Sequence, residues 1–172
     1  MLPLSIGNDI CHIPRIIKIL RAQHGSRFVH RILTKQETLQ PRAQSVLQCI
    51  LAAETKSTQT GPDAPGRKDE LRKAAEYIAG RFAAKEAAIK AHPQHNLTYH
   101  QIEIQRLKMP TKASPAPDEP SGQTMDDPRS SGPPVAKISP GNGQDPSFAS
   151  VSISHDGEYA MAVCLSSASS ST

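Results

Sequence analysis

Residues 81–91 form an alanine-rich segment that carries a carboxylate and an ammonium at a spacing suited to chemistry. Glu86 and Lys90 stand four residues apart, so on a helix they share one face. Asp9 lies far away, at the end of a short apolar segment. If the fold brings Asp9 beside Glu86, two hard oxygen ligands and a nearby cation are available, as a Mg²⁺ ion carrying a phosphate ester requires. The pattern therefore predicts phosphoryl transfer.

Two elements must position these side chains. Residues 70–91 are predicted to form a long central helix, with Ile78, Phe82 and Ile89 among its core positions. Residues 2–10 are typical of a short buried strand that ends in a Gly-Asn-Asp turn. Such a turn would leave the Asp9 side chain at the end of a strand, where sites are commonly built.

The remaining elements complete an α+β fold. An apolar stripe with a period near 3.6 predicts a basic helix that begins near Pro14. Thr34 and Glu37 resemble a capping box that opens a further helix. Alternating apolar residues predict strands at 99–107 and 135–139 and a hairpin over 149–165. We therefore expect a small antiparallel sheet packed against a long central helix and an N-terminal basic helix.

The length and the proline distribution set the domain organisation. The 172 residues suit one domain, which we place at 1–165. A Gly/Pro-containing loop at 55–68 and a Pro/Ser-rich insert at 108–131 interrupt it, and the composition of the insert is typical of disorder. Residues 166–172 form a polar tail.

The net charge of +4 is unevenly distributed. Residues 10–36 contain no acidic side chain, whereas the helix predicted there carries Arg15, Lys18 and Arg21. Such a one-signed face attracts acidic partners, although a simply solvated helix face is an alternative. Aromatic residues make up only 3% of the chain, too few for the base stacking that nucleic-acid binding uses. We expect an acidic protein partner and no nucleic acid.

Cysteine content and hydropathy narrow the class of protein further. The three cysteines are odd in number and widely spaced, which predicts neither a disulfide framework nor a zinc site. No apolar run approaches the roughly 20 residues needed to span a bilayer. We therefore expect no membrane association.

Three segments in a fixed order resemble a known family, the phosphopantetheinyl transferases of the holo-acyl-carrier-protein synthase type. The quoted segments are Gly7-Asn8-Asp9-Ile10 with Ile13-Pro14-Arg15, then Arg81-Phe82-Ala83-Ala84-Lys85-Glu86-Ala87 with Lys90-Ala91, then Val151-Ser152-Ile153-Ser154-His155 with Tyr159-Ala160. The helical segment is quite specific, and the other two gain weight from their order. The resemblance covers roughly residues 2–35, 77–107 and 135–165 and neither insert.

The resemblance implies transfer of the phosphopantetheine arm of coenzyme A to a serine of an apo acyl carrier protein. Asp9 and Glu86 would hold Mg²⁺, Lys90 would contact the same phosphates, and Glu86 is the candidate general base. The candidate contacts to the nucleotide 3'-phosphate are Arg81, Ser154 and His155. Lys85 points about 100° away from Glu86 around the helix, so it is predicted to meet a peripheral phosphate or solvent.

The family also implies partners and a location. Carrier proteins are acidic, which suits docking on the helix that carries Arg15, Lys18 and Arg21. Short members of the family are trimers with the cofactor between subunits, so a homotrimer is expected. The basic N-terminal third is typical of mitochondrial targeting, with the cytoplasm as the alternative location and no separate leader expected. The competing function is a carrier-binding protein that has lost catalysis.

This sequence departs from the family pattern in three places. Asn8 precedes Asp9, where the family usually has Thr or Val. Residues 92–96 replace a glycine-containing loop that commonly lies near the cofactor. Residues 140–146 stand where the family has a helix, and Pro140 and Pro146 prevent one there.

Overall fold

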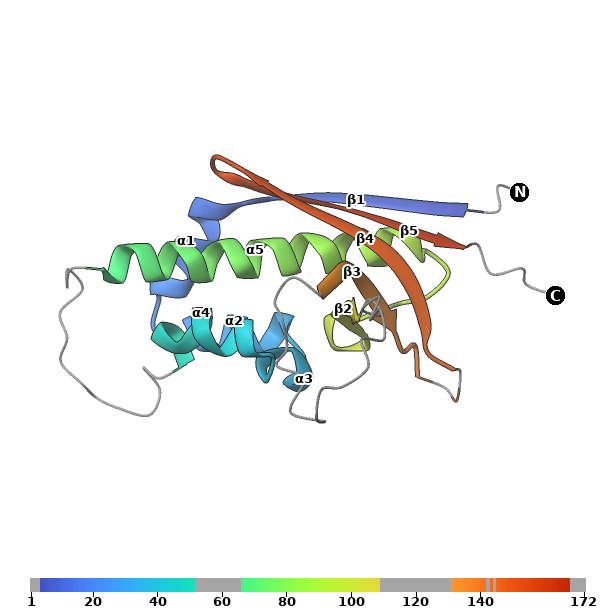
Figure 1. Cartoon of the computed structure of the whole chain (residues 1–172), viewed down its shortest axis with the longest axis horizontal. Coiled ribbons are helices and arrows are strands. Elements are labelled where there is room, and N and C mark those ends of the chain that lie inside the picture. Colours follow the sequence, from blue (N-terminus) through green and yellow to red (C-terminus); the bar gives the residue numbers. More distant parts are fainter. Residues whose placement is uncertain (1–3, 52–65, 109–130, 142, 144, 168–172) are drawn as a thin grey trace, which may run out of the picture.

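The computed structural model describes residues 4–51, 66–108, 131–141, 143 and 145–167. The described chain forms an antiparallel sheet and a set of helices around one long helix (Figure 1). The elements are, in order, β1 (Leu4–His12), α1 (Ile13–Arg21), α2 (Gly25–Ile32), α3 (Lys35–Thr38), α4 (Pro41–Leu51), α5 (Arg67–Ala91), the 3₁₀ turn η2 (Tyr99–Gln101), β2 (Ile102–Lys108), β3 (Ser131–Ile138), β4 (Ser147–Asp156) and β5 (Tyr159–Ser167). The predicted α+β class is confirmed.

The sheet has five strands in the order β1-β5-β4-β3-β2, and every neighbouring pair is antiparallel. The N-terminal strand therefore pairs with the C-terminal one, and Asp9 stands opposite Ala162. Strands β4 and β5 form the predicted hairpin, whose tight turn contains Gly157 at φ +54°. Glycine suits this position because a side chain disfavours positive φ.

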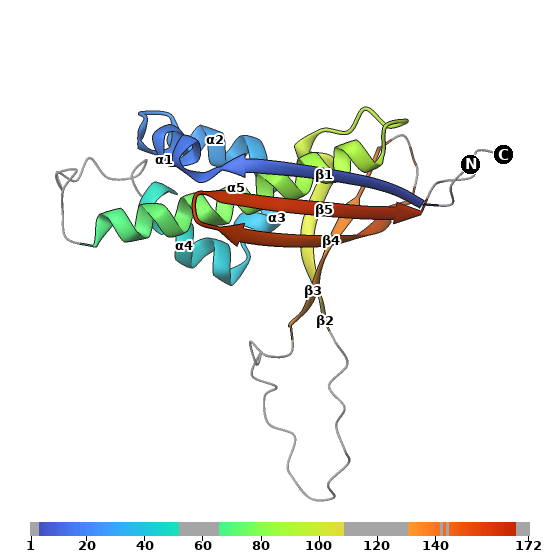
Figure 2. The same cartoon turned by 90° about the horizontal axis from the view of Figure 1, so that it is seen from above.

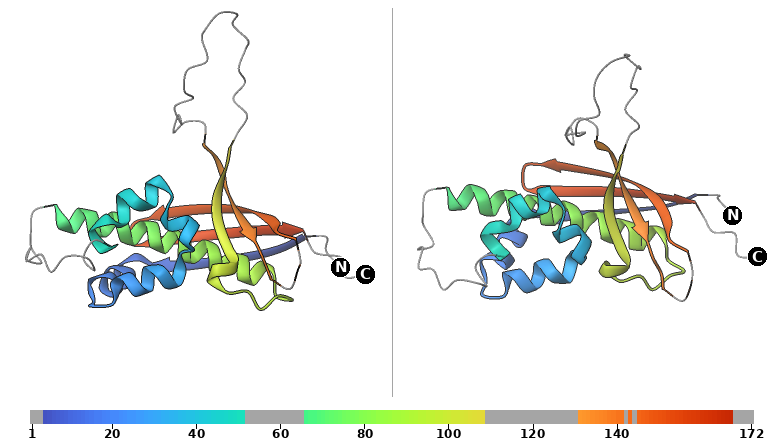
Figure 3. Two further views of the ribbon diagram at one scale, coloured as in Figure 1. Left: turned by 90° about the horizontal axis from the view of Figure 1, so that it is seen from below. Right: turned by 60° about the horizontal axis from the view of Figure 1, so that its bottom comes forward.

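Helix α5 lies between the sheet and the other helices. It packs against β1, β5 and β4 on one side and against α1, α2 and α4 on the other, an arrangement visible in Figures 1 and 3. All the alanines of α5 are buried. Their small side chains let both layers approach the helix closely.

The structure corrects the expected element boundaries. Strand β1 continues to His12, so Asp9 lies within a strand and the predicted Gly-Asn-Asp turn is wrong. Thr34 and Glu37 do form a capping box, but the helix that they open ends at Thr38. Helix α4 then begins at Pro41, since proline suits the first turn of a helix. This helix is not predicted from the sequence.

The two inserts predicted from composition lie mostly outside the described residues, which omit 52–65 and 109–130, and so does most of the polar tail. In the described part of 139–146 the chain forms no helix, in keeping with the prolines there. Within the described chain, no helix is long and apolar enough to cross a membrane.

Candidate functional site

The first cluster of candidate residues lies where β1 packs against the C-terminal half of α5. Gly7 of β1 is so close to the helix that a Cβ atom there would come within 2.1 Å of the carbonyl oxygen of Ala87. This approach brings Asp9 to the helix, and Lys90 Nζ lies 2.8 Å from Asp9 Oδ1. The same ammonium donates to the carbonyl oxygen of Asn8 at 3.0 Å. Two residues far apart in the sequence are therefore in direct contact.

The second carboxylate oxygen of Asp9 indicates that a positive group belongs at this point. Asp9 Oδ2 is buried and has no hydrogen-bond partner among the described residues, an arrangement that costs free energy unless a cation or donor binds there. No group of three or more potential metal ligands occurs in the part of the chain that the structure describes. Mg²⁺ needs only one or two carboxylates beside phosphates and water. The donor set fits that ion better than zinc or calcium.

Glu86 stands one helical turn before Lys90 on α5, and its carboxylate contacts Tyr99. The Tyr99 hydroxyl donates a hydrogen bond to Glu86 Oε1. Burial first, and then this bond and the charge of Glu86, raise the pKa of Tyr99 to about 12, and the charge of Asp9 acts in the same direction. The phenol therefore stays a donor at neutral pH. The charges of both carboxylates thus act on the same phenol.

Lys85 corrects the expectation that it meets solvent or a peripheral phosphate. Its side chain is fully buried, and its ammonium donates to Glu37 Oε2 at 2.5 Å and to the carbonyl oxygens of Ile32 at 2.7 Å and Tyr99 at 2.9 Å. Burial lowers the pKa of Lys85, and the charge of Glu37 opposes that change. An ammonium with three buried acceptors is satisfied and cannot reach a ligand.

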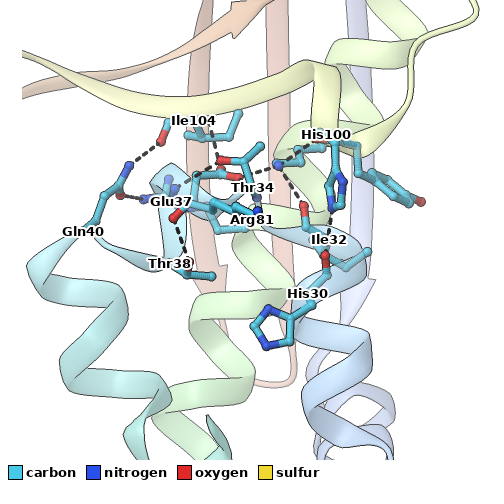
Figure 4. Close-up of polar contacts among 12 residues, drawn as sticks. His30, Ile32, Thr34, Glu37, Thr38, Gln40, Arg81, His100 and Ile104 are labelled. Carbon is cyan, nitrogen blue, oxygen red and sulfur yellow. Dashed lines mark hydrogen bonds and ion pairs between the residues drawn. The ribbon is translucent and has the colours of Figure 1, made fainter.

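Glu37, predicted from the sequence only as a helix-capping residue, is also the buried partner of Lys85. Its Oε2 also accepts from the backbone N–H of Thr34 at 2.8 Å, and its Oε1 accepts from the N–H of Ile104 at 3.0 Å. Figure 4 shows this carboxylate between the start of α3 and strand β2. The capping box was the available signal for Glu37, but no local pattern indicates Lys85 as its partner.

Arg81 and His155, the expected nucleotide contacts, line one cavity of about 770 Å³. His155 Nε2 donates to the carbonyl oxygen of Glu76 at 2.9 Å. Gly80 permits this contact, because a Cβ atom there would lie 2.9 Å from the imidazole. Ser154, on the same strand as His155, has an exposed side chain and does not line the cavity.

The lining of this cavity is strongly basic. The Arg81 guanidinium stacks over Tyr77 at 5.0 Å from the ring centroid and donates to Gln40 Oε1 at 3.4 Å. Its Nε is buried and lacks a partner among the described residues. Three further cations line the cavity, namely Arg42, Lys73 and Arg106. None of Asp9, Glu86 and Lys90 lines it, so the two groups of candidate residues occupy different places on one chain.

The basic helix α1 adjoins the first cluster. Arg15, Lys18 and Arg21 are all exposed, in agreement with the predicted polar face. The Arg15 guanidinium lies 5.7 Å from the centroid of the Phe82 ring, and Phe82 precedes Glu86 by one turn of α5. A partner held on this face of α1 would therefore lie close to Glu86.

The C-terminal end of α5, next to Lys90, is fixed by a histidine in the segment that departs from the family pattern. His92 is buried, and its Nδ1 lies 2.7 Å from the carbonyl oxygen of Ala88, so this nitrogen must carry the proton. Its Nε2 lies 2.8 Å from the Ser166 hydroxyl oxygen. The imidazole thus connects the end of the helix to β5.

Comparison with known proteins gives one family. The model described as "4'-phosphopantetheinyl transferase superfamily" matches residues 5–164. Mitochondrial 4'-phosphopantetheinyl transferase B of Aspergillus fumigatus is 38% identical over 92 residues, which are 53% of this chain and 55% of that protein. A holo-[acyl-carrier-protein] synthase of Wolbachia pipientis is 36% identical over 101 residues, which are 58% of this chain and 62% of that protein. The matches span little more than half the length of these relatives.

A solved structure shares the fold. The crystal structure of holo-ACP-synthase from Plasmodium yoelii superposes with a TM-score of 0.52 at 23% identity, and the match covers 94% of this chain and 91% of that chain. At this identity the likeness concerns the arrangement of helices and strands alone.

Proposed function

Because the chain belongs to the 4'-phosphopantetheinyl transferase superfamily, we propose that it transfers the 4'-phosphopantetheine arm of coenzyme A to a serine of an apo acyl carrier protein. The other product is adenosine 3',5'-bisphosphate. The observation that carries this proposal is the buried, unpartnered Oδ2 of Asp9 beside Lys90, with Glu86 one helical turn away. Relatives named as holo-[acyl-carrier-protein] synthases support the substrate pair.

The residues of the first cluster would have different roles at the pyrophosphate of coenzyme A. Asp9 and Glu86 would hold Mg²⁺, which when bound neutralises charge that builds on the leaving phosphate. Lys90 Nζ, now paired with Asp9, would donate to the same phosphate oxygens. Its side chain is 51% exposed, so it can turn toward a ligand without leaving a buried site.

Proton transfer is assigned to Glu86. The serine oxygen attacks the phosphorus that bears the pantetheine, the bond from that phosphorus to the bridging oxygen breaks, and the adenosine bisphosphate leaves with the electron pair. The serine proton passes to Glu86, directly or through a bound water. The Tyr99 hydroxyl already occupies Glu86 Oε1, which leaves Oε2 for contact with the ion or with that water.

The nucleotide end of coenzyme A would bind in the basic cavity. Arg81 and His155 would meet the 3'-phosphate, and the unpartnered Nε of Arg81 offers a donor. Ser154, exposed on the neighbouring surface, would contact the same phosphate from outside the cavity. Each charge-assisted contact is worth about 1.5–3 kcal/mol.

A homotrimer with coenzyme A between subunits would bring the two groups of residues together. Support comes from the face of the sheet turned away from α5, where β1, β5 and β4 lie side by side (Figure 2). Ile6 stands opposite Leu165 and Ile10 opposite Met161, and all four are exposed, Ile6 by 70%. Exposed apolar side chains gathered on two neighbouring strands are typical of an interface. The pyrophosphate would lie on one subunit and the nucleotide in the cavity of its neighbour.

The acidic carrier protein would dock on α1 through Arg15, Lys18 and Arg21, which are exposed next to the first cluster. Charge complementarity of this kind accelerates encounter and fixes orientation. We place the activity in the mitochondrion, with support from the name of the Aspergillus relative.

The test is a mass measurement on the carrier. The full chain is mixed with Mg²⁺, coenzyme A and an apo carrier, and the carrier is expected to gain the mass of one phosphopantetheine arm. Glu86→Gln, which keeps the size and shape of the side chain, is the matched control and should give no mass gain on the carrier. A wild-type chain that binds the carrier without modifying it would overturn the proposal and favour a carrier-binding protein without catalysis.

A further inference from the structure

We propose that Tyr99 is a positioning residue that fixes the orientation of the Glu86 carboxylate. This inference rests on the proposed function, because it assigns Tyr99 a role through Glu86. From the sequence, Tyr99 is predicted only to begin a strand. In the structure it is the residue that connects the buried Lys85–Glu37 pair to the first cluster.

Two consecutive residues of α5 bind the two ends of Tyr99. Lys85 Nζ donates to the Tyr99 carbonyl oxygen at 2.9 Å, and Glu86 Oε1 accepts from the Tyr99 hydroxyl. Consecutive residues on a helix point about 100° apart, so the tyrosine must lie across the helix surface to meet both. The backbone and the side chain of Tyr99 are therefore both hydrogen-bonded to the turn of α5 that carries Glu86.

The backbone contact is rigid because Lys85 is itself held. Its ammonium also binds Glu37 and the carbonyl oxygen of Ile32, and both oxygens of Glu37 are occupied by donors from α3 and β2 as well. A fully satisfied buried network of this kind restricts the geometry of every member. Tyr99 is thus attached to a point that cannot move independently of the core.

The ring and the turn of Tyr99 are restrained separately. The ring packs against Phe82 with centroids 5.8 Å apart and planes tilted by 42°. The turn η2 is closed by a capping box in which the N–H of Thr98 donates to Gln101 Oε1 at 2.8 Å. With the ring restrained, the hydroxyl can serve as a fixed donor.

A fixed donor on one oxygen of Glu86 determines where the other oxygen points. Hydrogen bonds to a ligating carboxylate commonly orient it, and their loss typically costs about 10- to 100-fold in metal affinity or activity. Without the hydroxyl, rotation about the terminal bonds of Glu86 would spread its oxygens over several positions. Tyr99 would then act on catalysis without touching the substrate.

The experiment compares Tyr99→Phe with Tyr159→Phe, in purified full-length protein. Phenylalanine keeps the ring that packs on Phe82, and Tyr159 is a half-exposed tyrosine whose hydroxyl makes no hydrogen bond in the described structure. We expect Tyr99→Phe to lower kcat and the affinity for Mn²⁺, measured by electron paramagnetic resonance with coenzyme A present, by about 10- to 100-fold each. The carrier KM should stay unchanged, and Tyr159→Phe should match the wild type.

A double-mutant cycle separates positioning from a merely structural role. In a Glu86→Gln background, Tyr99→Phe should change Mn²⁺ affinity by less than about twofold, because the residue through which the hydroxyl acts is no longer a carboxylate. If Tyr99→Phe changed Mn²⁺ affinity equally in both backgrounds, or if it left kcat and Mn²⁺ affinity at wild-type values, the role of Tyr99 would be overturned and the proposed function would stand. A wild-type chain that neither binds Mn²⁺ nor modifies the carrier would instead overturn the proposed function.

Discussion

Helix α5 carries two lysine–carboxylate pairs five residues apart, Lys85–Glu37 and Lys90–Asp9. The first pair is completely buried, whereas in the second the lysine is 51% and the aspartate 16% exposed. The chemistry of the two pairs is the same, and their surroundings differ.

The satisfaction of hydrogen-bonding groups separates the two pairs. All the carboxylate oxygens and the ammonium of Lys85–Glu37 meet protein partners. In Lys90–Asp9 one carboxylate oxygen remains buried without a partner among the described residues. A complete set of partners stabilises one geometry, while an incomplete set keeps capacity for a ligand. Whether all polar atoms of a charged pair have hydrogen-bond partners therefore indicates its role better than its location does.

The largest effect is expected from Lys85→Met, which leaves the Glu37 carboxylate buried and unpaired. Removing one partner of a buried pair costs about 3–5 kcal/mol of the free energy of unfolding. Urea denaturation followed by circular dichroism measures this loss, with Lys90→Met as the matched control. A loss below about 1 kcal/mol, the range of exposed pairs, would remove the distinction between the two pairs.

The converse variant, Lys90→Met, is expected to cost less stability than Lys85→Met and to weaken coenzyme A binding. Because the Lys90 side chain is 51% exposed, its loss should lower the free energy of unfolding by less than the loss of the fully buried Lys85, whereas a charge-assisted contact to phosphate contributes about 1.5–3 kcal/mol, or roughly tenfold to a hundredfold in affinity. Isothermal titration calorimetry with coenzyme A and Mg²⁺ provides the measurement. Unchanged affinity together with a large drop in unfolding free energy would reverse the assigned roles.

Gly7→Ala tests what brings Asp9 to α5. A Cβ atom at this position would lie 2.1 Å from the Ala87 carbonyl oxygen and 2.6 Å from the Ala91 nitrogen, so β1 must move away from the helix. We expect a loss of about 1–3 kcal/mol in unfolding free energy and a lower transfer rate in the folded protein. A variant with wild-type rate and stability would show that Asp9 does not depend on this contact.

The smallest effect is a pH dependence specific to the buried pair. Burial lowers the pKa of Lys85 in the folded chain below its ordinary value of 10.5. Between these two values the unfolded chain binds more protons than the folded one, so stability rises with pH there. The unfolding free energy of the wild type minus that of Lys85→Met should increase toward about pH 10, by at most about 1.4 kcal/mol per unit of pKa difference. A difference that falls with pH contradicts the assignment.

Local patterns predicted most of the fold. The apolar periodicity of α1 and α5, the Thr34–Glu37 capping box and the β4–β5 hairpin depend on residues close in sequence, and the structure confirms them. Helix α4 is not predicted from the sequence because it directly follows the short helix α3. No glycine separates the two helices, and no acidic residue marks the first turn of α4. The predicted surroundings of Lys85 are wrong because its partner Glu37 lies 48 residues away in the sequence.

The site divides in the same way. The spacing of Glu86 and Lys90 predicted their shared face, and the contact of Lys90 with Asp9 agrees with the predicted neighbourhood. The role assigned to Tyr99 could not be predicted, since it depends on how η2 folds back over α5. Long-range packing decides such contacts, and no periodicity in the sequence records it.

The pairing of Lys108 with Ser131 at the ends of β2 and β3 has a practical consequence for protein engineering. Directly paired residues of antiparallel strands lie about 5 Å apart, a gap that two residues in a tight turn can close. Strand β2 is also the edge farthest from β1 in the strand order. A shortened gene that joins these positions through Asn-Gly would yield a smaller protein for crystallisation, and the same junction offers a place to attach a fluorescent label.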